Sequence, residues 1–320
     1  MGVFRGDDGE GDGVIVLWRL LVFPGFAFMA VCGMAFEWVD RRMIAPFQGR
    51  VGPPWYQPLA DLIKLFAKED VVTAGGHEIA AAALPIVSLA AVLTAVLYVP
   101  VGGVSAASYE GDLIVVLFLL SLPALAYFLA GWVSPGVYSL IGGHRSLLQY
   151  FSYEVPFMMA VAGPAVLVGS WQISEIVQHQ AQTAWIALVQ PLGFLLAVIG
   201  LIGKLKRDPL DIPKAKSEVV GGSLTEYSGR KMALWRLTMD MQTVAGIFLL
   251  VNLFLGESRF FEALPTFAVF AAKALALLLG LSTASALYAR LRIDQLASLG
   301  WRVLAPLALL QIMVTLWVGG

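Results

Sequence analysis

Eight apolar segments of roughly membrane-spanning length follow one another along this chain. They occupy residues 14–36, 79–101, 113–133, 155–168, 185–202, 239–255, 264–288 and 303–318, and the fourth can be extended back to 147. A helix needs about 20 apolar residues to cross the hydrocarbon core of a bilayer. Backbone groups in lipid must be hydrogen-bonded within the protein, and the alternating strands of a barrel are absent. The sequence therefore predicts an all-α integral membrane protein, a single polytopic domain (1–320) with eight transmembrane helices.

The composition supports this class and argues against several kinds of bound group. Hydrophobic residues make up 59% and charged residues 13% of the chain, whereas a soluble domain has about 25% charged residues. An iron–sulfur cluster needs several thiolates, and Cys32 is the single cysteine. His77, His144 and His179 lie far apart, without the spacing of metal ligands. We expect no metal or redox cofactor in this chain, and the net charge of −1 without a basic tract predicts no nucleic-acid partner.

The lysines and arginines predict how the chain is oriented in the membrane. The loops after the first, third, fifth and seventh segments contain 5, 1, 8 and 3 of these residues, while Arg5, Arg19 and Arg259 lie toward the other side. The positive-inside rule places the four richer loops in the cytoplasm. We therefore expect a multi-pass protein of the cytoplasmic (inner) membrane with both termini on the non-cytoplasmic side.

A short amphipathic helix is expected within the first cytoplasmic loop, residues 37–78. Apolar residues recur there at the helical spacing i, i+3, i+4 and i+7, at Leu59, Leu62, Ile63 and Phe66. Asp61, Lys64 and Lys68 fall on the opposite face. The segment is too short to span the bilayer, so it lies along the lipid interface or packs under another protein of a complex.

The longest polar passage is the loop 204–236, which mixes both signs of charge with several glycines. One interpretation is a solvated connector that only fixes topology. The other is a loop folded partly inward, whose carboxylates line a polar cavity at the membrane surface. The glycines and the mixed charge favour the second, because a simple connector needs neither.

Ionisable residues at membrane depth are a further functional signal, because each is costly if left unpaired. Glu154 and Asp240 stand at the heads of the fourth and sixth segments, Lys273 lies in the seventh, and Asp40 follows the first. The pKa of a carboxylate in a partly dehydrated site can rise toward neutral, so that the group exchanges protons near neutral pH. This set of residues therefore predicts a proton relay. The alternative for any one of them is a structural ion pair, such as Glu154 with a nearby arginine. Motifs for nucleotide binding, metalloprotease chemistry or a catalytic triad are absent, so no catalytic residue is expected.

Motifs in the same stretches follow one another in a recognisable order. The first loop contains D-R-R at 40–42, Q-G-R-V-G-P at 48–53 and K-E-D at 68–70. Later come Q-Y-F-S-Y-E-V at 149–155, R-D-P-L-D-I-P at 207–213 and T-E-Y-S-G at 225–229. From about residue 37 to residue 301 the chain closely resembles the membrane subunit of respiratory complex I that seals the quinone chamber, known as the H subunit or subunit one.

The resemblance implies a subunit without a redox centre, placed beneath the last iron–sulfur cluster of a soluble arm. Its acidic channel would link that arm to antiporter-like membrane subunits. The implied acidic path comprises Asp40, Glu154, Glu218, Glu226, Asp240 and Lys273. The implied cavity loop contains Arg207, Asp211, Lys214 and Lys216. The residues implied in docking of the soluble arm are Arg41, Arg42, Arg50, Asp61, Lys64 and Arg145.

Departures from the family pattern favour one branch of it. Lys214 and Lys216 stand where the family has glutamates, Leu210 replaces a phenylalanine and Asp240 replaces a glutamate. The compact turn G-P-P-W-Y-Q-P at 52–58 resembles the equivalent subunit of energy-converting membrane-bound hydrogenases and formate hydrogenlyase-type complexes. That branch implies partner subunits with iron–sulfur clusters and a nickel–iron site. The alternatives are the quinone-chamber subunit of an NADH–quinone oxidoreductase, with quinone at the interface, a stand-alone secondary ion transporter, and a structural anchor without ion coupling.

Overall fold

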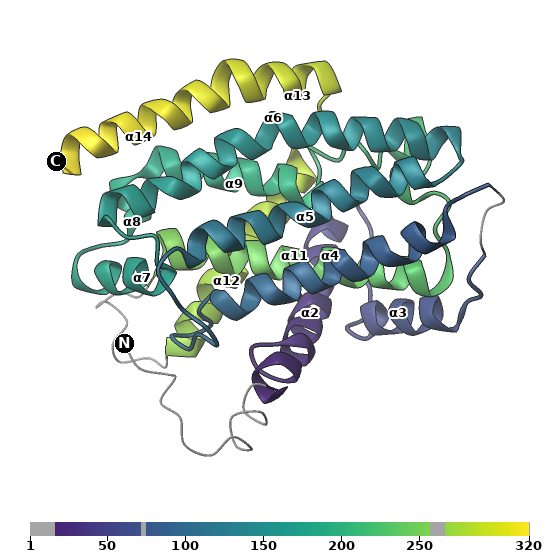
Figure 1. The fold of residues 1–320 in the computed structure, drawn as a ribbon, viewed down its shortest axis with the longest axis horizontal. Coiled ribbons are helices and arrows are strands. Elements are labelled where there is room, and N and C mark those ends of the chain that lie inside the picture. The colour runs from purple at the N-terminus through teal and green to yellow at the C-terminus, as the bar shows by residue number, and fades with distance from the viewer. Residues whose placement is uncertain (1–16, 72–74, 257–265, 320) are drawn as a thin grey trace.

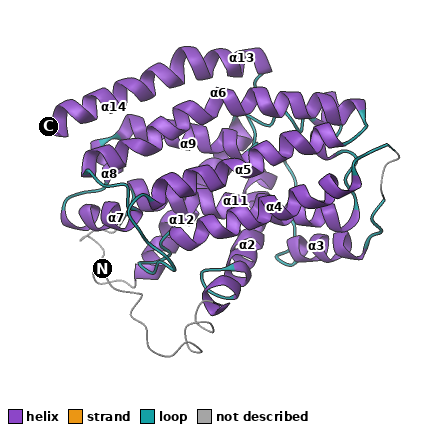
Figure 2. Cartoon of the chain, in the orientation of Figure 1, coloured by secondary structure: helices purple, strands orange, loops and turns teal. Residues whose placement is uncertain are grey.

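The computed structural model describes residues 17–71, 75–256 and 266–319. Within these residues the chain is helical and has no β-strand (Figure 2). Seven of the described helices are long and apolar enough to cross a membrane, at 17–47, 78–98, 112–133, 137–168, 229–254, 266–287 and 293–317. A shorter apolar helix, Pro191–Leu205, occupies the position of the fifth expected span. The prediction of an all-α integral membrane protein is confirmed.

Figure 1 shows how the elements are arranged. In chain order they are α2 Phe26–Phe47, α3 Gln57–Ala67, α4 Glu78–Tyr98, α5 Asp112–Val133, α6 Val137–Val168, α7 Ile173–Gln182, α8 Ile186–Val189, α9 Pro191–Leu205, α10 Lys216–Val219, the 3₁₀ turn η1 Gly222–Leu224, α11 Gly229–Phe254, α12 Thr266–Leu287, α13 Ile293–Leu299, the π turn η3 Gly300–Leu304 and α14 Ala305–Gly319. Figure 1 shows α3 and α7 at opposite ends of the bundle, here named the α3 end and the α7 end.

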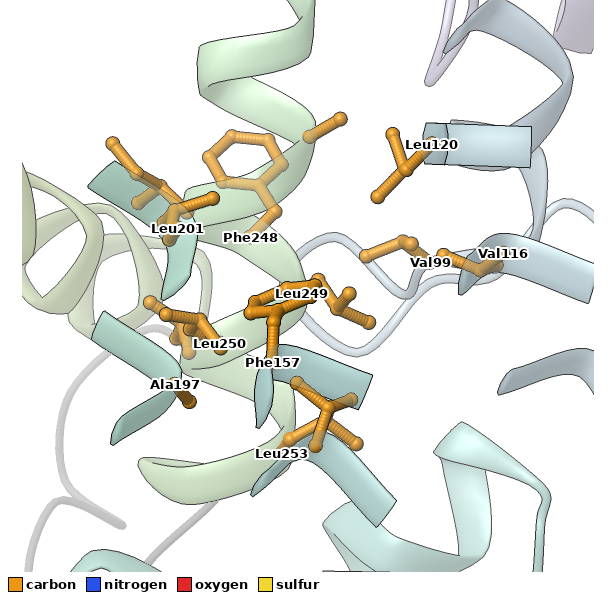
Figure 3. Close-up of a cluster of buried hydrophobic side chains, with 14 of the residues drawn as sticks. Val99, Val116, Leu120, Phe157, Ala197, Leu201, Phe248, Leu249, Leu250 and Leu253 are labelled. Atoms are coloured by element: carbon orange, nitrogen blue, oxygen red, sulfur yellow. The ribbon is translucent and has the colours of Figure 1, made fainter. Parts of the chain in front are cut away.

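Helix α11 forms the centre of the bundle. It packs against α4, α2, α3, α12 and α9, and 89% of its membrane window is buried. The part of α11 after its charged first turns is therefore apolar on all sides, as expected for a helix surrounded in this way. Figure 3 shows the result, with Phe248, Leu249, Leu250 and Leu253 meeting side chains of the surrounding helices.

The fifth expected span is interrupted in the structure. Helix α8 ends at Val189 and α9 begins at Pro191, whose ring removes a backbone N–H and ends the preceding helix. Gln190 lies at the break, where its side-chain amide donates to the Gly163 carbonyl oxygen at 3.3 Å and the Thr315 hydroxyl at 3.0 Å. The Gln190 side chain thus connects the break to α6 and α14.

The charged loop is shorter than the sequence predicted. Helix α9 continues to Leu205 and α11 begins at Gly229, which leaves 206–228 as the connection. The hydropathy of the sequence does not show that α11 begins at Gly229, because the first two turns of this helix contain charged residues. The helix nevertheless brings Arg236 and Asp240 one turn apart, with 3.8 Å between Nε and Oδ2.

The remaining loop is seated directly on helix α6. A Cβ added at Gly142 of α6 would lie 2.5 Å from the Cα of Gly222. Gly222 has φ +62°, and a side chain there would meet the Pro213 carbonyl oxygen at 1.8 Å. Only glycine allows both the left-handed backbone and the close approach. The loop is therefore folded against the bundle, which agrees with the second interpretation of its sequence.

Candidate functional site

A polar cavity of about 390 Å³ lies at the α3 end of the bundle, between α2, α5, α11 and the loop 206–228. Charged side chains of both signs line it: Glu37, Asp40, Arg41, Lys206, Arg207, Lys214, Arg236 and Asp240. Five of these eight are cations. The cavity is named the polar cavity below.

An ion-pair chain crosses three helices beside this cavity. Arg41 of α2 binds Asp61 of α3 at 3.0 Å and Glu37 of its own helix at 2.6 Å. Glu37 also contacts Arg236 of α11, which in turn lies 3.8 Å from Asp240. The two pairs within a helix are four residues apart, the spacing that places side chains on one face. Acid and base alternate along the chain, so a change of charge at one member alters the field at the next.

Asp40 joins α2 to two other parts of the chain. Its Oδ1 accepts from Arg207 at 2.8 Å and from the Ser282 hydroxyl of α12 at 2.5 Å. The bond between Asp40 and Arg207 spans 167 residues of sequence. The acidic-path residue and the cavity-loop residue expected from the motifs therefore meet in space.

Two lysines on the cavity wall lie beside one aromatic ring. The ammonium of Lys206 is 4.4 Å from the ring centroid of Tyr127, and that of Lys214 is 5.9 Å from it. Lys206 is 8% exposed. Burial, together with the neighbouring charges of Lys214 and Lys204, lowers the pKa of Lys206 to about 7. Burial also lowers the pKa of Lys214, against the opposing attraction of Asp211 and Asp240.

Glu154 forms a buried ion pair rather than a contact with the polar cavity. Lys204 of α9 donates to Glu154 of α6 at 2.6 Å, and both side chains are buried. A small cavity of about 10 Å³, lined by Lys204, Lys206 and Lys214, lies between this pair and the polar cavity. Glu154 is thus adjacent to the polar cavity, with Lys204 as its partner where an arginine was suggested.

Glu218, another expected path residue, lines a second cavity of about 450 Å³. Arg145 and Glu218 contact each other on its wall. Arg290, from the segment after α12, also lines it and binds Asp211 at 3.2 Å. Glu218 and Asp211 therefore form ion pairs outside the polar cavity. The side chain of Lys216 lies outside the described residues.

Glu226 and Lys273 are placed apart from the other path residues. Glu226 borders a pocket of about 30 Å³ beside His77, with its Oε1 next to Gly136 at the beginning of α6. A carboxylate there complements the positive end of the helix dipole. Lys273 of α12 donates to the carbonyl oxygens of Leu255 and Gly256, at the α7 end of α11.

Five of the six expected docking residues lie on α3 or near it, whereas Arg145 belongs to α6 and lines the second cavity. Arg41 and Asp61 connect α3 to α2, and Arg42 lies 5.6 Å from the ring centroid of Trp38. Arg50 and Lys64 are exposed. The apolar residues of α3 and the turn before it are exposed as well: Val51, Trp55, Tyr56, Leu59, Ile63 and Phe66. The amphipathic helix is present as predicted, with much of its apolar surface uncovered.

Sequence reasoning did not assign roles to several residues that the fold brings to the site. Glu37 and Arg236 each stand four residues from an assigned partner, so helical spacing could have indicated them. Lys206, Tyr127 and Ser282 come from separate segments, and no local pattern connects them. Among the described residues, no cluster of three or more histidine, cysteine, aspartate or glutamate side chains could hold a metal ion.

Comparison with known proteins gives a consistent result. The chain matches the family described as NADH dehydrogenase over residues 20–316. It is 34% identical to the H subunit of NADH-quinone oxidoreductase from Dehalococcoides mccartyi (strain CBDB1), over 91% of this chain and 83% of the relative. It is 38% identical to the H subunit numbered 2 of NADH-quinone oxidoreductase from Geobacter sulfurreducens, over 87% of this chain and 89% of the relative.

A solved structure of the membrane-bound sulfane sulfur reductase, an archaeal respiratory membrane complex, contains a chain of the same fold. The two have a TM-score of 0.85 and 28% sequence identity, and the match covers 95% of this chain and 99% of that one. The family match and the curated relatives extend over most of the chain, which confirms the resemblance seen in the motifs. The chain belongs to the NADH dehydrogenase family and is a membrane subunit of the complex I type.

Proposed function

We propose that this chain is the membrane-anchor and coupling subunit of a complex-I-type oxidoreductase, and that it links redox chemistry in a soluble arm to ion translocation. The observation that carries the proposal is the ion-pair chain from Asp61 of α3 to Asp240 of α11. One end of this chain is at the exposed α3, and the other lies deeper, on the central helix.

The physical basis is a coupled set of charges in a partly dry cavity. Two arginines connect the three carboxylates of this chain. Arg41 forms ion pairs with Asp61 and Glu37, and Arg236 forms ion pairs with Glu37 and Asp240. A charge that appears at the α3 end shifts the balance of every later pair, because interactions between charges are stronger where water is scarce. Protonation or reorientation of Asp240 is then the step that would pass the change toward membrane partners.

The docking role is supported by the α3 end of the bundle. Exposed arginine and lysine side chains there adjoin the exposed apolar residues of α3. Protein–protein interfaces commonly have an apolar centre surrounded by a polar rim, and this combination of side chains matches that arrangement. We infer that the soluble, cofactor-bearing arm binds at this end, on the cytoplasmic side of the inner membrane.

The test uses the intact complex, purified through this chain and reconstituted in vesicles. Asp240→Asn should lower the number of ions moved per electron pair, because the amide cannot take up a proton. Glu175→Gln, an equivalent change on the exposed face of α7, serves as the control. An unchanged ratio in Asp240→Asn would show that this chain of ion pairs does not couple the two processes.

Within this class we favour a hydrogenase-related complex over a quinone-reducing one. Lys214 brings a cation to the wall of the cavity where the family pattern has a glutamate, and the turn at 52–58 is compact. The quinone alternative is supported by the curated relatives, which are NADH-quinone oxidoreductase subunits. Hydrogen evolution and quinone reduction by the purified complex distinguish the two. Isolation of the chain without partners would instead favour a stand-alone transporter.

A further inference from the structure

Two cations on the polar cavity have no anionic partner. The ammonium of Lys206 lies over the face of Tyr127, 4.4 Å from the ring centroid. Lys214 donates to the sulfur of Met239 at 2.9 Å, and a thioether is a weak acceptor. In the described part of the chain, neither ammonium has a carboxylate within 4.0 Å or an oxygen acceptor within hydrogen-bond distance.

The carboxylates nearby are already engaged by other cations. Glu154 is bound by Lys204, Asp40 by Arg207, Asp211 by Arg290, and Glu37 and Asp240 by Arg236. With Lys206 and Lys214 the local cations number six against these five acids, so the cluster has a positive excess and the two lysines are its members without a carboxylate in contact.

This excess is energetically costly in a buried setting. An ion loses its hydration when it is buried, and contact with an aromatic face recovers only part of that cost. The site can lose a proton or gain an anion. The cavity of about 390 Å³ is far larger than the ~30 Å³ that one water occupies, so an anion has room to enter.

A third group at the same place is suited to an anion. Tyr127 lines the polar cavity between the two lysines, and its hydroxyl is buried without a hydrogen-bond partner among the described residues. A phenol can donate to an oxyanion, and such donors are usually satisfied when buried.

We propose that Lys206, Lys214 and Tyr127 form a binding site for an oxyanion or carboxylate group in the polar cavity. The group is either a free small anion or an acidic side chain of a partner protein, because both present the same charged oxygens. The proposal goes beyond the coupling function and does not depend on it, because binding is measured without turnover.

The site should also couple anion binding to proton uptake. With the pKa of Lys206 lowered to about 7, the empty site loses a proton as the pH rises above 7. A bound anion favours the ammonium and restores the proton, so affinity is full below pH 7 and declines above it. Between pH 6 and pH 8 the affinity should fall about tenfold for one lysine. The charged groups that face the two lysines are Glu37, Asp40, Arg41, Glu154, Lys204, Arg207, Asp211, Arg236 and Asp240. Those that keep the same charge between pH 6 and pH 8 do not change the direction in which anion affinity depends on pH.

The experiment measures equilibrium binding of [³⁵S]sulfate to the intact, detergent-purified complex at constant chloride concentration. Wild type should bind sulfate, and Lys206→Met and Lys214→Met should each weaken binding at least about tenfold, as expected for loss of one charged contact. Arg302→Met, at an exposed cation of η3 that does not line the polar cavity, is the control and should bind as wild type. Lys206→Arg keeps the charge and should retain binding, which covers the case in which a methionine variant fails to assemble.

A second arm identifies the source of the anion. If a partner's carboxylate fills the site, sulfate does not bind, and a zero-length carbodiimide reagent links Lys206 or Lys214 to an acidic peptide of another protein in the complex. That result supports the site and assigns its occupant. Absence of both sulfate binding and the cross-link would overturn the proposal. Sulfate binding that is unchanged in both methionine variants would also overturn it.

Discussion

At the scale of single residues, the structure distinguishes between two roles that the sequence allowed for Glu154. The sequence allowed a proton carrier or an ion pair at this position. In the structure Glu154 and Lys204 lie 2.6 Å apart, 4% and 2% exposed, and the Gln149 amide beside them bonds the Gly203 and Leu210 carbonyl oxygens. Such a pair is costly to break because its remaining partner stays buried and charged.

The first prediction follows from this pair. Glu154→Gln should destabilise the fold by roughly 3–5 kcal/mol because it leaves the Lys204 ammonium unpaired. The double variant Glu154→Gln with Lys204→Met should recover most of that loss, since no buried charge remains. The melting temperature of the detergent-solubilised complex measures both. A single variant as stable as wild type would mean that the pair contributes no stability.

At the scale of elements, the site depends on how closely the loop 206–228 is held against α6. Gly142 meets Gly222 with no room for a methyl group, and α6 contacts η1 over several residues. Amphipathic periodicity predicted where helices occur, but it could not predict that this loop packs onto one of them. Close approach of this kind depends on small residues on both sides.

The second prediction compares two glycines within helices. Gly142→Ala should lower stability by about 1–3 kcal/mol because the methyl group forces α6 and the loop apart. Gly280→Ala, in the middle of α12 with no atom within 4 Å of the added carbon, should be neutral or stabilise by up to about 1 kcal/mol. Thermal unfolding of the two variant complexes provides the comparison. Equal effects would indicate that the loop is not seated on α6.

At the scale of the whole molecule, the charged sites gather at the α3 end. The polar cavity, the second cavity and the pocket of Glu226 all border the loops of that end. Lys273 is the exception among the expected path residues. It lies nine residues before Ser282 on α12, roughly 13 Å along the helix axis, and its bonds to Leu255 and Gly256 favour a role as a cap for α11.

The third prediction concerns membrane orientation. In a Cys32→Ser background, Val51→Cys should react with a membrane-impermeant maleimide only from the cytoplasmic side. Val104→Cys, in the loop between α4 and α5, should react only from the opposite side. Both positions are exposed, at 97% and 54%. Labelling of right-side-out and inverted vesicles distinguishes the sides, and a reversed pattern would contradict the positive-inside assignment.

The sequence by itself determined the class of protein, the approximate spans, the amphipathic helix and the family. These properties depend on local composition, periodicity and motif order, all of which can be read within a window of about 20 residues. Most of the charged residues that line the polar cavity could also be singled out from the sequence, because they are ionisable residues in or beside apolar segments. The beginnings of α6 and α11 were missed, because polar and charged first turns lower hydropathy without preventing a helix.

Only the tertiary structure decided which charges meet. Asp40 binds Arg207 from 167 residues away, Lys204 neutralises Glu154, and Glu226 and Lys273 are separated from the polar cavity. The excess of cations around Tyr127 likewise becomes visible only when each acid is matched to its partner. Pairing of buried charges depends on distance and desolvation in three dimensions, and neither quantity is encoded in the spacing of residues along the chain.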